Sequence, residues 1–546
     1  MASNLNLANT KDLLPRLTEQ EVQSRIEELT QKLRNSDIYL LLKQTALQET
    51  KSPSSNTSNS SAVVSNSQFI SDVQQRINRS VLSRVLANQV YRELKLRDQT
   101  VLEAEPLGFV RRAQLLWEKR ILKSLNTMCT ELSVPLARRR GKQEQIEMKT
   151  KWNEIGTGNP NLEQYRPVYA PKDFLEVVAS LVNPNSTLSS SGSSEEVNGY
   201  WGIVQVNLDV KSIEQLRVEY SSLCIDKCQS GLDDRYQSSH FAVERDAGVR
   251  RVAKQGLSAV CEVAARRGNP VGQRAVMWEK ILGVRVDEID RLYYSQMKNE
   301  VIQHDLMIDN IIFKDIKLTS VNDDFFFVFE DYLYQVLLIF VRDTSVLKWR
   351  NCMMANPLKA YLRGKIGNEN YCVVYPPSGV IPFHGFSMYV APLCFIYADP
   401  VKLYFVFREL YVRFFCHLHC LSSNPKGILA VSALFESLLM SLAPSLFFHL
   451  KSIGSAPLKI AFKWLMRAFS GYLEADQLLV LWDRVISHDS NEILAVMAAG
   501  LFLYRSANLM NVTSPAAAEA IMADLSTVKV IPILQIILAT NTEKSK

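Results

Sequence analysis

The hydrophobic positions of this chain recur mostly at the spacing of an α-helix. Residues 19–48 and residues 112–136 each carry apolar side chains every three or four positions, which predicts two amphipathic helices in the N-terminal half. The apolar faces consist of Val22, Ile26, Leu29 and Leu33 in the first helix, and of Trp117, Ile121, Leu125 and Met128 in the second.

The helical pattern becomes denser from about residue 266 to the C-terminus. Short segments with Pro, Gly or Asn separate the apolar stretches, and residues 407–418 are expected to form one helix with a broad apolar face. Patterns with the period of a strand are scarce, and residues 200–210 are the candidate for a strand or two. The sequence therefore predicts an all-α fold, with a C-terminal helical domain of roughly 230 to 280 residues.

Two polar stretches interrupt the helical patterns. Residues 51–68 and 183–199 are rich in Ser and Asn and have few large apolar residues. Burial in such segments does not offset the entropy lost on ordering, so we expect two flexible linkers or loops.

Composition adds only weak constraints on function. The net charge of +6 is small for 546 residues and gives no strong case for nucleic acid as a partner. The sharpest basic cluster, residues 137–142, is expected to be a solvated helix end or loop, or else a localisation or phosphate-binding patch. Nine scattered cysteines and an N-terminus without an apolar leader indicate a reducing, cytoplasmic location. Since uncharged apolar runs stay below about 18 residues, direct insertion into a membrane is not expected.

Familiar motifs for catalysis and metal binding are missing or weak. The sequence contains neither a phosphate-binding Walker loop nor a serine-hydrolase elbow. Cys416, His417, His419 and Cys420 resemble a metal-ligand cluster, but on a helix the two histidines would point away from the two cysteines. Cys224 and Cys228 lack a second ligand pair at the spacing of a zinc site. We therefore expect no metal.

The C-terminal half resembles the TBC domain of Rab GTPase-activating proteins. Residues 266–283 are similar to the opening motif of that family, through Arg274 and Trp278. Residues 449–486 are similar to its closing helices, through His449, Leu450, Trp464, Phe469, Trp482 and Asp483. The ordered set of matches covers some 220 residues, and it is more specific than any one tryptophan.

The resemblance implies a domain organisation and a partner. It assigns residues 266–490 to a TBC domain, and it implies an all-helical fold and a GTP-bound Rab-family GTPase as the partner. GTP and Mg²⁺ would belong to that partner, so no cofactor is expected for this chain. A role in vesicle trafficking, with recruitment to membranes through a Rab, also follows from the resemblance. The remaining segments are expected to be helical residues 1–50 and 69–182, a connecting region 200–265 and C-terminal helices 491–546.

The family is understood to supply an arginine from the motif I-x-x-D-x-x-R and a glutamine from Y-x-Q. Ile312, Asp315 and Thr319 match the first motif, but Leu318 stands at the arginine position. A shifted alignment on Ile302 and Asp305 places Ile308 there instead. Gly385 and residues 391–393 align with the second motif, where Pro382 replaces the tyrosine and His384 the glutamine.

These substitutions leave several alternatives open. Leucine cannot stabilise charge that develops on a phosphate, and the adjacent cation, Lys317, would point about 100° away on a helix. His384 is able to orient a water molecule, or it only fills the turn. We therefore expect a regulator of Rab GTP hydrolysis with weak or non-standard activity, rather than an enzyme with a substrate of its own. The alternative is a catalytically inactive TBC domain that binds a Rab or acts as a scaffold. Arg274, Trp278, Asp315, Lys317, Gly385, Trp482 and Asp483 are expected to form the Rab-facing surface and its framework.

Overall fold

The computed structural model describes residues 19–34, 36–51, 71, 75, 81–102, 107–158, 161–181, 201–223, 239–322, 326–350, 359–362 and 371–538. Both predicted linkers lie almost entirely outside this set, as do Cys224 and Cys228. The chain divides into two compact units. The first comprises residues 1–99 and 256–259, and the second comprises the rest.

The first unit is helical. Its helices are α1 (Glu19–Arg34), α2 (Asp37–Lys51) and most of α4 (Val81–Leu102). The amide of Asn88 on α4 donates to the Gly256 carbonyl over 2.7 Å, and its oxygen accepts from the Ser258 N–H over 3.0 Å. One side chain thus joins two segments that lie far apart in the sequence.

The second unit begins with elements that precede the TBC-like region. They are α5 (Gly108–Leu132), β1 (Ala137–Arg139), α6 (Lys142–Thr150), the 3₁₀ helix η2 (Trp152–Thr157), α7 (Pro171–Ala179), α8 (Ile213–Glu219), η3 (Ser221–Leu223), α9 (Ser239–Gln255) and most of α10 (Ser258–Ala265), whose first two residues belong to the first unit. The predicted face of α5 is confirmed, because Trp117, Ile121, Leu125 and Met128 are all buried.

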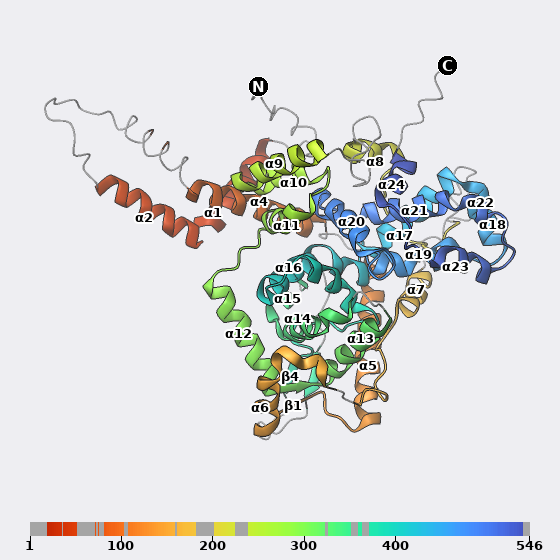
Figure 1. Ribbon diagram of the computed structural model, residues 1–546, viewed down its shortest axis with the longest axis horizontal. Helices are drawn as coiled ribbons and strands as arrows, with labels where there is room; N and C mark the ends of the chain where they lie inside the picture. The colour runs from red at the N-terminus through yellow and green to blue at the C-terminus, as the bar shows by residue number, and fades with distance from the viewer. Residues whose placement is uncertain are drawn as a thin grey trace, which may run out of the picture. The chain divides into compact units, whose positions relative to one another are not determined.

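Two lobes of helices follow along the chain (Figure 1). The first lobe contains η4 (Val271–Gln273), α11 (Arg274–Leu282), α12 (Glu288–Gln303), β2 (His304–Leu306), α13 (Met307–Asn322), η5 (Phe327–Phe329), α14 (Glu330–Arg342), α15 (Thr344–Arg350), β3 (Lys359–Leu362), β4 (Tyr371–Val374), η6 (Phe386–Tyr389), η7 (Ala391–Phe395), α16 (Pro400–Arg413) and η8 (Phe415–His419). The second lobe contains α17 (Ile428–Leu442), α18 (Pro444–Ser452), α19 (Pro457–Met466), α20 (Ala475–His488), α21 (Glu492–Tyr504), α22 (Ser506–Leu509), α23 (Pro515–Ala523) and α24 (Val530–Leu538).

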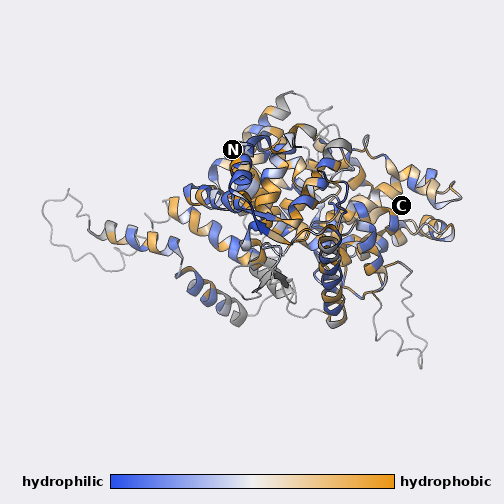
Figure 2. Cartoon of the chain, turned by 90° about the horizontal axis from the view of Figure 1, so that it is seen from below, coloured by the Kyte–Doolittle hydropathy of each residue, from blue (hydrophilic) through white to orange (hydrophobic). Residues whose placement is uncertain are grey.

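Each lobe is organised around one buried helix. In the first lobe α14 packs against α12, α13 and α16, and in the second α21 packs against α17, α19, α20 and α24. Helix α21 is buried on all sides from Glu492 to Phe502, as a helix without a polar face must be. Its Gly500 leaves no room for a Cβ, because the Ile533 carbonyl of α24 occupies that space. Figure 2 shows hydrophobic and hydrophilic residues mixed along many of the helices.

The all-α prediction is confirmed. The described strands form only two short antiparallel ribbons, β1–β2 and β3–β4. The β1–β2 ribbon pairs Ala137 with Leu306 and Arg139 with His304. The basic cluster therefore lies in a strand and at the start of α6, and Arg138 and Arg140 are both ion-paired with Asp305.

Three local predictions were wrong. Residues 19–48 form two helices, α1 and α2, instead of one, because the chain bends at Ser36, whose hydroxyl accepts from the Tyr39 N–H in the first turn of α2. Residues 201–210 contain an isolated bridge at Gln205 but no strand, because the N–H groups of Ile203 and Val204 donate to the Glu436 carboxylate instead. Residues 407–418 are not one helix: α16 ends at Arg413, Phe414 leaves the helical region at φ −129°, and the 3₁₀ helix η8 follows. Both sides of this break are buried, so the apolar spacing alone did not reveal it.

In the part of the chain that the structure describes, no single helix is long and apolar enough to cross a bilayer. Helices α17 and α18 reach that length and hydropathy only as a pair, across a bend of 111°.

Candidate functional site

Helix α13 carries the first altered motif. Its N-terminal end is fixed by Asp309, which accepts from the Leu306 N–H and pairs with both terminal nitrogens of Arg342 over 2.5 and 2.6 Å. Ile312 and Asp315 are buried, whereas Leu318 is half-buried. Since Leu318 follows Asp315 by three positions, the two side chains emerge on neighbouring parts of one helix face.

Asp315 joins this helix to the loop that carries the second altered motif. One carboxylate oxygen accepts from the Gly385 N–H over 2.6 Å. The other accepts from the N–H and the hydroxyl of Ser387 over 2.9 and 2.7 Å. The Ser387 hydroxyl also lies 2.8 Å from the hydroxyl of Thr319, one turn further along α13. The structure therefore brings together Asp315 and Gly385, which lie 70 positions apart in the sequence.

His384 precedes this anchored turn. Its N–H donates to the Tyr169 carbonyl over 2.9 Å, so the backbone is fixed on a second side. Its side chain is 39% exposed, and Nδ1 lies 3.6 Å from the Asp315 carboxylate. That separation exceeds a hydrogen bond, and Nδ1 has no hydrogen-bond partner among the described residues. The imidazole is therefore held beside Asp315 while a good part of its surface stays accessible.

Lys317 is directed to different partners. Its ammonium group forms an ion pair with Glu330 over 2.6 Å and donates to the Gly156 carbonyl over 2.9 Å. These contacts fix the charge on η2 and at the start of α14. In this arrangement Lys317 is not available at the arginine position.

Arg467 is a component of the site that the sequence did not indicate. It follows the last residue of α19, and its guanidinium donates to the His384 carbonyl over 2.7 Å. Gly385 has φ +96°, and a Cβ there would overlap this guanidinium. Because 83 positions separate His384 from Arg467, helical periodicity gave no signal for their contact.

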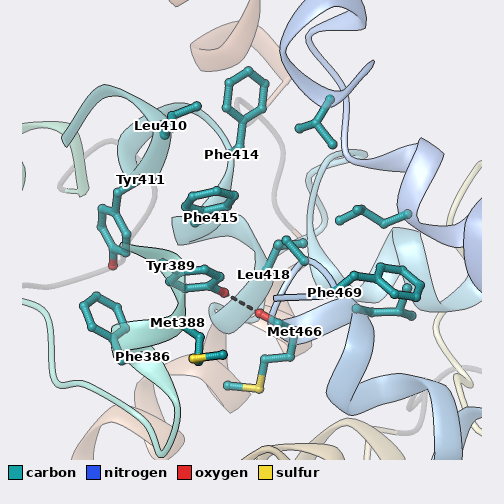
Figure 3. Packing of buried hydrophobic residues seen from close by; sticks show 14 of the residues in the cluster. Phe386, Met388, Tyr389, Leu410, Tyr411, Phe414, Phe415, Leu418, Met466 and Phe469 are labelled. Carbon is teal, nitrogen blue, oxygen red and sulfur yellow. Dashed lines mark hydrogen bonds between the residues drawn. The ribbon is translucent and has the colours of Figure 1, made fainter. Parts of the chain in front are cut away.

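The turn after Arg467 contacts the 3₁₀ helix η6 directly. Ala468 and Phe469 both adopt the left-handed region, with φ +48° and +65°. From the turn, the Ser470 hydroxyl donates to the Met388 carbonyl of η6. In the other direction, the Tyr389 hydroxyl of η6 donates to the carbonyl of Met466, the last residue of α19 (Figure 3).

A buried aromatic cluster lies behind the loop. Tyr389 stacks on Phe415 with ring centroids 4.5 Å apart, and Phe386 meets Tyr411 edge-on at 5.8 Å (Figure 3). Such pairs stabilise the interior beyond simple burial. The loop thus rests on a rigid base, while part of the His384 side chain remains exposed.

The other residues predicted for the site lie in the interior. Arg274, Trp278, Trp482 and Asp483 are each at most 5% exposed, so they form framework rather than surface. The Asp483 carboxylate accepts from Trp278 Nε1 over 2.7 Å and pairs with Arg274 over 3.2 Å, which joins α11 to α20. Trp482 Nε1 donates to the Ala468 carbonyl over 3.0 Å. The framework therefore supports the turn that positions Arg467.

The Cys and His cluster of η8 is buried and does not gather ligands. Cys416 donates to the Val412 carbonyl, and His419 Nε2 lies 2.9 Å from the Tyr411 hydroxyl. Burial lowers the pKa of His417 to about 3, so this imidazole is neutral at physiological pH. Among the described residues, no group of three Cys, His, Asp or Glu side chains is arranged to hold a metal ion.

Comparison with known proteins relates the sequence to a family. Residues 372–510 match the family model of the Rab-GTPase-TBC domain. TBC1 domain family member 19 of Homo sapiens is 49% identical over 530 residues, which cover 95% of this chain and 98% of that protein. Among solved structures, the Ypt/Rab-GAP domain of Gyp1p is 13% identical with a TM-score of 0.36, over 54% of this chain and 96% of that one. The Chlamydomonas flagellar RabGAP TBC domain is 12% identical with a TM-score of 0.36, over 61% and 95%. With about half of its residues shared along nearly the whole length of a curated relative, the chain belongs to the family of Rab-GTPase-TBC domain proteins.

Proposed function

We propose that this chain binds the GTP-loaded form of a Rab-family GTPase through the face that carries Leu318 and His384, and that it accelerates GTP hydrolysis only weakly. The observation that carries the proposal is the aliphatic side chain at position 318. An arginine placed against the transferred phosphate is worth roughly 10³ to 10⁵ in rate, and leucine provides neither charge nor donor there.

The intact support of the loop favours retained binding. Asp315, the Arg467 turn and the buried framework hold residues 384–387 in one conformation, so the partner meets a preorganised surface. His384 is accessible and able to orient water, which is the role of the glutamine in relatives. Weak activation in the cytoplasm, after recruitment by the same Rab, is the function that this combination supports.

The second candidate is a TBC domain that binds a Rab without any acceleration. The contacts of Lys317 with Glu330 and Gly156 favour it, because they remove the nearest cation on α13 from the arginine position. The two candidates differ only in rate, so kinetics separates them.

Single-turnover GTP hydrolysis across a panel of Rabs tests the proposal. We expect the wild type to accelerate hydrolysis by less than roughly 10²-fold, and Leu318→Arg with His384→Gln to gain at least about 10-fold over it. Leu292→Arg is the matched control, since it places arginine at a 63% exposed leucine of α12. No acceleration by the wild type would select the second candidate, and acceleration of roughly 10³-fold or more would overturn the proposed defect. Capture of GTP-loaded Rabs, with GDP-loaded Rabs for comparison, tests binding separately. Retention of none would refute both candidates.

A further inference from the structure

Two cations and an aromatic ring lie beside the His384 loop. The Lys463 ammonium and the Arg467 guanidinium are 5.9 and 5.7 Å from the centroid of the Tyr472 ring. Lys463 is exposed, whereas Arg467 and Tyr472 are half-buried. The ring therefore organises two positive charges at the end of α19.

Neither cation is neutralised within the described part of the chain. No described carboxylate lies within 4.0 Å of the charged nitrogens of Lys463 or Arg467. Other arginines of this unit behave differently: Arg274, Arg342 and Arg413 pair with Asp483, Asp309 and Asp489. Arg467 Nε is buried and has no hydrogen-bond partner in the described structure, so the free energy favouring an external anion comes from the unneutralised charge and not from this donor. A half-buried guanidinium without a counter-ion gains free energy from an anionic group supplied from outside.

The position of this charge links it to the site. The same guanidinium donates to the His384 carbonyl over 2.7 Å and lies against Gly385. A partner that contacts the imidazole of His384 therefore also lies close to the charge of Arg467, and Lys463 shares the Tyr472 ring with that arginine. Position 318 of α13, a leucine, contributes no charge.

We propose that Lys463, Arg467 and Tyr472 form a cationic contact surface for the anionic face of a GTP-loaded GTPase. This assignment rests on the proposed function and names the residues that hold the partner there. This surface places positive charge beside His384, the glutamine position. Leu318, at the arginine position on α13, provides none. It acts on affinity and association rate, because the two cations complement the acidic side chains and phosphate charge that surround bound GTP.

The Rabs that the capture experiment retains are loaded with GTPγS and immobilised, and the affinity of each variant for them tests the assignment. We expect Lys463→Glu to weaken binding at least about 10-fold at low salt, and Lys463→Met about 3-fold. For both Lys463 variants, the affinity should also fall less steeply with salt concentration than it does for the wild type. Lys459→Met is the matched control, because Lys459 is exposed one turn earlier on α19, and it should change affinity less than about twofold. Arg467→Lys keeps the charge but loses the planar fork, and it should fall between the wild type and Lys463→Glu.

The outcomes separate this assignment from the proposed function. If a Rab binds the wild type and Lys463→Glu with equal affinity, the contact surface is refuted while the proposed function stands. If no Rab binds the wild type, both fail together. Vesicles that contain phosphatidylserine provide a further arm. If the wild type is retained on these vesicles, Lys463→Glu is not retained, and the Rab affinity is unchanged, the assignment to a GTPase is overturned.

Discussion

Replacement of Asp315 by alanine should disrupt the loop that carries His384. The wild-type carboxylate is 6% exposed and accepts three hydrogen bonds, from the N–H of Gly385 and from the N–H and hydroxyl of Ser387. A hydrogen bond to a charged group contributes roughly 1.5 to 3 kcal/mol, and a buried donor left without a partner costs roughly 1 to 3 kcal/mol. The three bonds are not additive, and removing a buried charge offsets part of the loss. We therefore expect a net destabilisation of roughly 3 to 5 kcal/mol.

Two measurements check this estimate. Guanidinium-induced unfolding of the whole chain gives the change in midpoint, and hydrogen exchange of peptides that cover residues 383–389 gives the local opening free energy. The local measurement matters because a chain with two units need not unfold in one step. Asp476→Ala is the matched control: its side chain is 68% exposed and its nearest cation is 3.9 Å away, so a change within about 0.5 kcal/mol is expected. A loss below about 1 kcal/mol for Asp315→Ala, with unchanged exchange at Gly385 and Ser387, would refute the reasoning.

Two further substitutions address the backbone and the buried histidine. Gly385→Ala should destabilise the loop by roughly 1 to 3 kcal/mol and reduce Rab capture, because φ is +96° and the new Cβ would overlap Arg467. The control is Gly272→Ala, where a Cβ meets nothing within 4 Å, and this variant should melt like the wild type in calorimetry. Equal melting temperatures of the two variants would contradict this account. His417→Gln should reduce acid sensitivity. Burial lowers the folded pKa of His417 from 6.5 to about 3, so below pH 6.5 the unfolded chain binds a proton that the folded chain does not, and stability falls as the pH falls. Between pH 7.5 and 5.5 the wild type should lose roughly 1 kcal/mol more than the variant in urea unfolding, and parallel losses would show that His417 is not responsible.

Helices were predictable because their pattern is local. The stretches that became α5, α14, α19 and α20 all carry the 3.6-residue period. The break at Phe414 was not predictable, since a helix that is buried on every side has no polar face whose position would shift at a kink. The extended segment at residues 201–210 was mistaken for strand because its backbone partner is the side chain of Glu436 rather than a neighbouring strand.

The candidate site was predictable only as far as motifs reach. Sequence placed Asp315, Leu318, His384 and Gly385 in two separate motifs, and the structure joins the motifs through one carboxylate. Arg467 was not predictable, because its role arises from a turn with two left-handed residues and from the space above a glycine. Contacts of this kind depend on the packed positions of η6 and α19, and no local pattern encodes them.

The hydrogen bond from His384 to the Tyr169 carbonyl has a consequence for genetics. The match to the family model starts at residue 372, yet an acceptor that fixes the loop comes from a segment far upstream of that boundary. Missense changes near residue 169 are therefore expected to disturb the same loop as changes at residues 384–387. The family model ends where sequence similarity is no longer recognisable, whereas the structural support of the loop includes residues outside that boundary.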